Sequence, residues 1–80
     1  MKDIERLLSL GKHLEVWKLP SEEIAVAYQD CFIKDGMFGV GMFGVGESFD
    51  EACADYIQKI AGQTLVFDGL LQKREEVRVL

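Results

Sequence analysis

Hydrophobic positions near the N-terminus recur with helical spacing. Ile4, Leu7 and Leu8 fall three and one positions apart, which places them on one face of a helix over residues 2–10. Gly11 follows where a glycine commonly ends a helix. We expect this short helix to pack on a sheet, because so few helical turns are marginal in isolation.

The hydrophobic period changes to two after this helix. Residues 13–19 and 24–33 are β-prone, and residues 20–23 form a predicted turn between them, so the two segments make an antiparallel hairpin. In the second strand one parity is largely apolar and is expected to face helices, whereas the other is small or polar and is expected to face water or a partner. The first set is Ile24, Val26, Tyr28 and Phe32, interrupted by Asp30, and the second is Ala25, Ala27, Gln29 and Cys31.

The clearest predicted helix begins at Ser48. Ser48 and Glu51 have the spacing of a capping box, in which the two side chains satisfy backbone N–H groups of the first turn. An apolar stripe then continues at spacings of three and one until Gly62, where we expect the helix to end. The stripe consists of Phe49, Ala52, Cys53, Tyr56, Ile57 and Ile60.

Three further segments complete the predicted topology. Residues 37–45 read as a third strand with a glycine-rich loop, residues 64–67 as a strand before the turn signal Asp68-Gly69, and residues 77–80 as a final strand at a sheet edge. The predicted order is α-β-β-β-α-β-β. This order is typical of the α+β class, with one antiparallel sheet and helices packed on one face. The length predicts a single domain, residues 1–80.

An apolar pentapeptide occurs twice in succession, as Gly36–Val40 and Gly41–Val45, and Gly46 would open a third copy. Because side chains alternate faces along a strand, a period of five would put Phe38 and Phe43 on opposite faces of one straight strand. A turn or bulge between the copies would resolve this conflict, or one copy is a loop that extends the hairpin. We favour the loop.

The repeat also creates the pattern Gly-x-Gly-x-x-Gly at Gly39, Gly41 and Gly44, with Asp68 where an acidic ribose ligand could lie. In dinucleotide-binding folds this pattern holds a pyrophosphate at a helix N-terminus. Here the helix cap, Ser48, lies four residues beyond Gly44, and the glycines follow from the duplication. The sequence therefore favours a structural glycine-rich segment and predicts no cofactor, with a nucleotide-binding module as an alternative.

Composition narrows the classes of function. The chain is 49% hydrophobic and 29% charged, and its net charge is −5. The negative balance disfavours binding to nucleic-acid phosphates. No apolar run is long enough for a membrane span and the N-terminus lacks an apolar signal core, so we expect a cytoplasmic protein without a membrane partner. A small domain buries a limited share of its surface, so self-association into a homo-oligomer is also expected.

Candidate reactive residues are few. Cys31 and Cys53 form no C-x-x-C pair and His13 is the only histidine, so no metal site is predicted. These three residues could in principle combine as a thiol and a base, yet each is explained by its place in a strand or on the apolar stripe. Adjacent carboxylates such as Asp50 and Glu51 point apart on a helix. We therefore predict no enzymatic activity and no catalytic residue.

Apolar residues that one short strand cannot bury favour an interaction protein. Met37, Phe38, Met42 and Phe43 lie beside glycines, and Met-Phe surfaces adapt to partners. Trp17, in the predicted hairpin, is a second candidate contact. These residues fit either a separate protein partner or a homodimer interface.

The segment Gly46-Glu47-Ser48-Phe49-Asp50-Glu51-Ala52 resembles the junction in HicB-type antitoxins, in which a short sheet leads through a Gly-x-[Ser/Thr]-x-x-Glu-Ala turn into a helix. The resemblance implies a HicB-like architecture and a small toxin as partner. That family usually carries a Pro-Gly segment before the motif, where this chain has Met-Phe-Gly-Val.

A longer pattern over residues 44–67 is similar to small uncharacterised phage and prophage proteins, which implies an accessory or interaction role. The element order also resembles that of double-stranded RNA-binding domains. However, Asp50 and Glu51 stand where those domains have a basic helix start, so the resemblance implies no RNA binding here.

Overall fold

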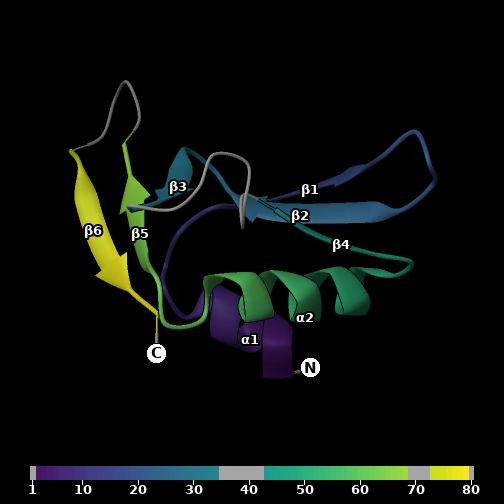
Figure 1. Cartoon of the computed structure of the whole chain (residues 1–80), viewed down its shortest axis with the longest axis horizontal. Coiled ribbons are helices and arrows are strands. Elements are labelled where there is room, and N and C mark those ends of the chain that lie inside the picture. Colours follow the sequence, from purple (N-terminus) through teal and green to yellow (C-terminus); the bar gives the residue numbers. More distant parts are fainter. Residues whose placement is uncertain (1, 35–42, 69–72, 80) are drawn as a thin grey trace.

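The computed structural model describes residues 2–34, 43–68 and 73–79. In chain order these residues form α1 (Lys2–Leu8), β1 (Leu14–Lys18), β2 (Ile24–Tyr28), β3 (Cys31–Ile33), β4 (Gly44–Gly46), α2 (Phe49–Ile60), β5 (Thr64–Phe67) and β6 (Glu75–Arg78). The mixed α+β class predicted from the sequence is confirmed (Figure 1).

The described strands form two antiparallel sheets instead of the single sheet that the sequence predicted. The first sheet has the strand order β1-β2-β4, and the second sheet has the order β3-β5-β6. The split lies inside residues 24–33, which were predicted as one strand. Asp30 has a φ of 54°, in the left-handed region that Asp tolerates better than most residues, so the chain bends there and β3 enters the second sheet.

This bend also changes which side chains of residues 24–33 face the core. Phe32 was predicted to face the helices, but it lies on the outside of the second sheet and is 42% exposed. Cys31 and Ile33 pack against the core instead. The parity argument fails beyond Tyr28 because the turn at residues 29–30 resets the alternation.

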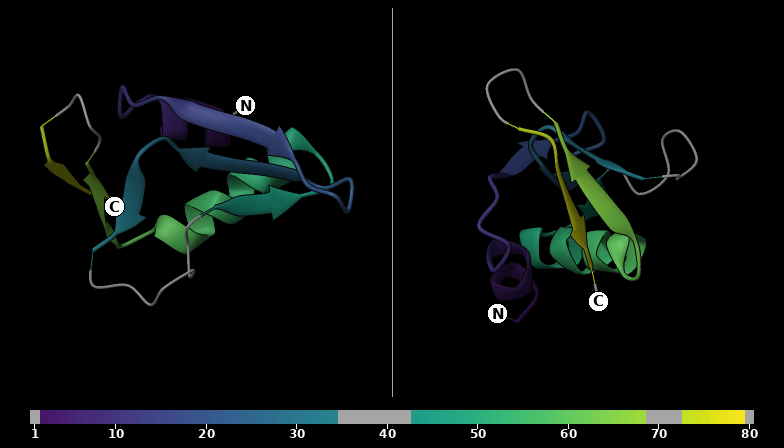
Figure 2. Two further views of the ribbon diagram at one scale, coloured as in Figure 1. Left: turned by 90° about the horizontal axis from the view of Figure 1, so that it is seen from above. Right: turned by 90° about the vertical axis from the view of Figure 1, so that its left-hand side faces the viewer.

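Both helices lie on the same side of the first sheet (Figures 1 and 2). α2 packs directly against β2 and β4, and α1 packs against α2, not against a sheet as the sequence predicted. Leu7 anchors α1, since its side chain is buried and its carbonyl oxygen accepts a 2.5 Å hydrogen bond from the Tyr28 hydroxyl. α1 is therefore attached to the molecule through α2 and the end of β2.

The predicted capping and apolar stripe of α2 are confirmed. The Ser48 hydroxyl accepts a hydrogen bond from the backbone N–H of Glu51, and the Glu51 carboxylate accepts one from the N–H of Glu47. Four stripe residues are buried, and the other two pack partly buried against the core: Ala52, Cys53, Tyr56 and Ile60, with Phe49 and Ile57. Ser48 therefore caps the first turn as predicted, whereas Glu51 bonds to the residue before the cap and not to Ser48 as in a regular capping box.

Two glycines allow β4 to approach α2 closely. A Cβ atom on Gly44 would lie 2.3 Å from the carbonyl oxygen of Ala52, and one on Gly46 would lie 2.5 Å from the Cβ of Glu51. Real Cβ atoms do not come this close to other heavy atoms, so β4 can rest on the helix only with glycine at these positions.

The two sheets meet the helices around Tyr28, at the end of β2. Its ring lies 5.6 Å from the Tyr56 ring of α2 and 5.5 Å from the Phe67 ring of β5. Its backbone N–H donates a 3.1 Å hydrogen bond to the Tyr56 hydroxyl. Burial, together with nearby Cys31 and Cys53, raises the pKa of Tyr28 to about 12, so this phenol stays protonated.

The remaining predicted strands are partly matched. β5 coincides with the predicted residues 64–67, and β6 is an edge strand as predicted but begins two residues earlier than residue 77. Within the predicted third strand, residues 37–42 lie outside the described residues, and residues 44–46 form β4 beside β2.

Candidate functional site

The candidate site is the surface of the first sheet that is turned away from α2, which we call the outer face. Gly44 and Gly46 point toward α2, so the alternation of a strand turns Val45 to the outer face. Val45 pairs with Ala25, and Ala25 pairs with Trp17, so the strand register places all three side chains on the outer face. The helices leave this face uncovered (Figure 1).

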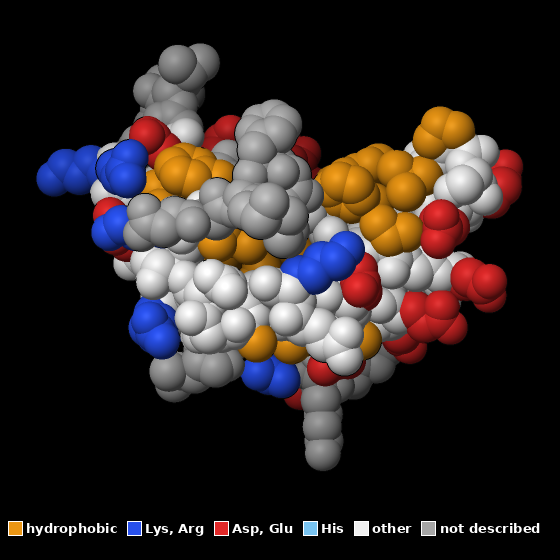
Figure 3. All heavy atoms as spheres, in the orientation of Figure 1, with side chains coloured by type: hydrophobic (Ala, Val, Ile, Leu, Met, Phe, Trp, Pro, Cys, Tyr) orange, Lys and Arg blue, Asp and Glu red, His pale blue; other side chains and the backbone are white. Residues whose placement is uncertain are grey.

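Trp17 and Phe43 form the centre of the outer face. Their ring centroids lie 5.8 Å apart, although 26 positions separate them in the sequence. Each ring remains substantially exposed, Trp17 at 40% and Phe43 at 37%, whereas Ala25 between the flanking strands is fully buried. In Figure 3 hydrophobic side chains gather over the first sheet, at the upper right of the view. An exposed aromatic pair on a scaffold of strands is typical of a binding surface.

Contacts from α2 hold Phe43 and the start of β4, which follows it. The Lys59 ammonium donates a 3.2 Å hydrogen bond to the carbonyl oxygen of Phe43, and its nitrogen lies 6.0 Å from the centre of the Phe43 ring. The Asp55 carboxylate accepts a 2.9 Å hydrogen bond from the N–H of Val45 and pairs with Lys59 at 2.9 Å. The bond to Lys59, followed by the bond to Val45, lowers the pKa of Asp55. Phe43 is therefore positioned before any partner arrives.

Acidic residues are frequent in the segments that flank the outer face. Glu15 lies on this face because it pairs with Ala27, which has the same parity as Ala25, whereas Asp50 and Glu51 belong to α2 on the other side of the sheet. Residues 14–24 and 44–54 together contain six acidic residues and one lysine: Glu15, Glu22, Glu23, Glu47, Asp50 and Glu51, with Lys18. Lys18 pairs with Glu22 at 2.7 Å, and Lys59, beside Phe43, pairs with Asp55 at 2.9 Å, so acidic residues remain in excess in these segments. Figure 3 shows acidic side chains along the margin beside the hydrophobic cluster. The surface combines aromatic contact area with a negative field.

The structure brings together only part of the set predicted from the sequence. Trp17 and Phe43 meet, as described. The other predicted contact residues, Met37, Phe38 and Met42, lie outside the described residues.

The Gly-x-Gly-x-x-Gly pattern also lies only partly within the described residues. Gly39 and Gly41 lie outside the described residues. Gly44 packs on α2, and Asp68 follows β5 in the second sheet, where its carboxylate lies 3.9 Å from the Arg74 guanidinium. The close approach of Gly44 to a helix is a structural use for that glycine.

The two cysteines are held as thiols. Burial raises the pKa of Cys31 to about 11, an effect that a hydrogen bond with Tyr56 partly opposes. Burial, with smaller contributions from Asp50 and Asp3, also raises the pKa of Cys53. A thiol attacks as its thiolate, so neither side chain is activated as a nucleophile near neutral pH. Among the described residues no three His, Cys, Asp or Glu side chains lie together as a metal-ligand group.

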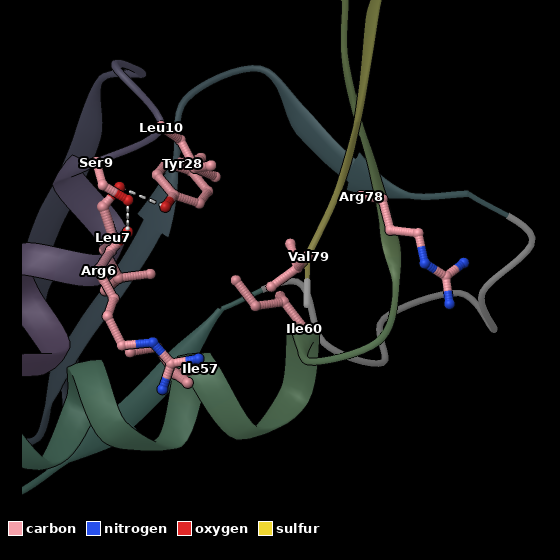
Figure 4. Close-up of a pocket in the computed structure, with 9 residues that line it drawn as sticks. All are labelled: Arg6, Leu7, Ser9, Leu10, Tyr28, Ile57, Ile60, Arg78 and Val79. Carbon is pink, nitrogen blue, oxygen red and sulfur yellow. Dashed lines mark hydrogen bonds between the residues drawn. The ribbon is translucent and has the colours of Figure 1, made fainter.

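A cavity of about 250 Å³ lies between α1, α2 and the end of β6 (Figure 4). Its lining is mostly apolar: Arg6, Leu7, Ser9, Leu10, Tyr28, Ile57, Ile60, Arg78 and Val79. The Tyr28 hydroxyl donates to Leu7 and the Ser9 hydroxyl donates to Arg6, so both are already used. Arg78 points away from the other lining side chains (Figure 4). The cavity is smaller than most ligand sites and offers few polar groups for recognition.

Sequence reasoning missed three contributors to the outer face. Val45 was predicted within the third strand but was not among the candidate contact residues, Lys59 was given no role, and Ala25, whose parity was expected to face water or a partner, is buried. The alternation of Phe43, Gly44, Val45 and Gly46 could have revealed Val45, since the two glycines mark the side that a helix approaches.

Comparisons with known proteins assign no family. No family model matches the chain, and neither a curated protein nor a solved structure matches it. Within the described residues, no helix is long and apolar enough to cross a membrane. The functional argument therefore depends on the surface chemistry of the outer face.

Proposed function

We propose that this chain is a non-catalytic protein-interaction module that binds its partner through the outer face. The observation that carries the proposal is the exposed Trp17–Phe43 pair, one ring from β1 and the other from the residue before β4. Aromatic side chains supply large contact areas at low entropic cost and dominate the binding energy of many interfaces. Lys59 and Asp55 hold the backbone at Phe43 and Val45, so little ordering of this segment is required on binding.

The negative charge of the chain suggests the chemistry of the partner. Glu15 shares the outer face with Trp17, and the chain carries a net charge of −5. A partner with lysine or arginine residues around an apolar centre would complement both features, and its association would be accelerated by the field. We propose a basic protein segment as the partner class.

A HicB-like antitoxin role is a second candidate within the same class. It is supported by the junction that suggested the resemblance, because β4 leads through Ser48 directly into the capped helix α2. Under this proposal the basic partner is a small toxin encoded beside this protein. Cells that produce this toxin should grow again when they also express this chain, and substitution of Trp17 should abolish that rescue.

The general proposal is tested by affinity capture with matched aromatic variants. Trp17→Ser and Phe43→Ser remove the proposed contacts, and Phe32→Ser removes an aromatic ring of similar exposure, 42%, from the second sheet. A partner identified by mass spectrometry with the native chain should then be purified and titrated against each variant. We expect about thirtyfold weaker binding for either outer-face variant.

Binding to Phe32→Ser should match the native chain, and affinity should fall as salt is added. Equal affinity for all three variants would show that the partner binds elsewhere. Affinity that does not change with salt would contradict the choice of a basic partner.

A further inference from the structure

The outer edge of the first sheet is formed by β1. Strand order places β2 between β1 and β4, so one side of β1 has no strand partner among the described residues (Figure 2). The backbone bonds from Leu19 to Glu23 and from Gln29 to His13 fix the pattern of the hairpin. In an antiparallel pair hydrogen-bonded positions alternate, so the odd-numbered residues of β1 bond to β2. The N–H and C=O groups of Leu14, Val16 and Lys18 therefore point outward.

This edge lacks the usual protection against pairing. The register with β2 runs through five consecutive residue pairs without a bulge, and β1 contains no proline. Its side chains are exposed on both faces of the sheet, Val16 at 51% on the helix side and Trp17 at 40% on the outer face. Natural sheets commonly blunt an exposed edge with bulges, prolines or several charges. β1 thus offers a regular strand edge flanked by apolar side chains.

We infer that a second copy of this chain pairs with β1, antiparallel and centred on Val16. In this two-fold register Val16 lies opposite Val16, Leu14 opposite Lys18, and Glu15 opposite Trp17. All outward N–H and C=O groups of the strand find partners, and no like charges lie directly opposite each other. A partner of any other sequence would need its own matching strand, whereas the two-fold register is already self-complementary.

The pairing changes what the proposed interaction surface looks like. Two copies of the first sheet become one continuous sheet, and the two outer faces become one surface with a Trp17–Phe43 pair in each half. The inference itself does not depend on the proposed partner, because it uses the backbone of β1 and the side chain of Val16 and not the aromatic contacts. Its failure can therefore be separated from failure of the proposed function.

The test measures the mass of the protein by native mass spectrometry and light scattering at micromolar concentrations. Val16→Pro removes an N–H that points away from β2, so the hairpin ladder is retained while the outward edge is broken. Arg78→Pro is the matched control. The bond from Val79 to Gln63 turns the N–H of Arg78 outward on β6 by the same alternation. We expect a dimer for the native chain and for Arg78→Pro, and a monomer for Val16→Pro.

A charge pair keeps the inference testable if Val16→Pro does not fold. Val16→Lys and Val16→Glu each place like charges opposite each other at the two-fold axis, and each should weaken dimerisation about a hundredfold. Mixing the two variants should restore a dimer that contains one copy of each. A monomeric native chain would overturn the inference, as would a dimer unaffected by these substitutions or a mixture in which the two variants fail to combine.

Discussion

The two sheets of this molecule cover their outward surfaces in different ways. On the second sheet, Val66 is fully buried although it faces outward between Phe32 and Glu76. The Arg74 guanidinium lies 5.9 Å from the Phe32 ring, and Lys34 bonds to Glu76 at 2.8 Å. On the first sheet, Ala25 is equally buried, but its cover consists of the exposed aromatic pair Trp17 and Phe43.

This difference separates a closed surface from an open one. Long charged side chains cover apolar area with their stems and keep their charges in water, so the second sheet needs no partner. Aromatic rings that pack against each other leave their outer surfaces in contact with water, and that area is available for binding. A similar amount of exposed aromatic surface therefore has a different meaning on each sheet.

The edge strands β6 and β1 differ in the same way as the two surfaces. β6 carries three charged residues in four, and Lys12 and Lys34 pair with Glu75 and Glu76 across to other parts of the chain. β1 has one acidic and one basic residue near its ends and Val16 at its centre. Charges along an edge discourage a further strand. The second sheet is thus protected at its β6 edge as well as on its face.

The largest expected effect comes from detaching the open sheet from its helix. Gly44→Ala would place a Cβ 2.3 Å from the Ala52 carbonyl oxygen and 2.5 Å from the Cβ of Tyr56, so β4 or α2 must move. We expect a loss of about 3 kcal/mol in the free energy of unfolding. Urea unfolding followed by far-ultraviolet circular dichroism would measure it.

Gly62→Ala is the control for that experiment. Its Cβ meets open space but its φ is 76°, so we expect a cost of about 1 kcal/mol from backbone strain alone. Equal losses in the two variants would contradict the close packing of β4 on α2.

A smaller effect is expected from the carboxylate that supports Phe43. Asp55→Asn weakens the bonds to Val45 and Lys59 and should cost about 1 kcal/mol near neutral pH. The folded pKa of Asp55 lies below its ordinary value of 3.8, so its contribution is present above that value and is lost as pH falls through the folded pKa. The difference between the native chain and Asp55→Asn should therefore shrink below pH 3.8. A difference that stays constant down to strong acid would show that the Asp55 charge does not hold β4.

The smallest effect on stability is expected where the closed surface is opened. Arg74→Ala removes the cation above Phe32 and ion pairs that are exposed to solvent, so stability should change by about 0.5 kcal/mol or less. Binding of a fluorescent hydrophobic dye should nevertheless increase, because the Phe32 ring, already 42% exposed, loses the cation that lies over it. Lys73→Ala, which removes a nearby charge without a described contact to Phe32, is the control. Unchanged dye binding in Arg74→Ala would contradict the role of charged stems in closing the second sheet.

Local signals in the sequence predicted the elements better than their assembly. Ser48, Glu51 and the apolar stripe identified α2 because capping and helical spacing act within a few residues. The division into two sheets was missed because it depends on one residue, Asp30, adopting a backbone conformation that its sequence only permits. The Trp17–Phe43 contact could be named residue by residue but not as a pair, since strand register alone brings the two rings together.

β4 takes Gly44 and Val45 from the copy of the pentapeptide nearest α2, and Gly46 is the residue that follows this copy. Each copy begins with glycine and ends with valine, and Gly46 follows the last copy, so an in-frame gain or loss of a copy leaves the same residues in front of Ser48. Replication slippage within this repeat would alter the length of the connection after β3 without altering the residues that rest on the helix. A change in the number of copies would therefore alter that connection in steps of five residues and leave the residues of β4 that contact α2 the same.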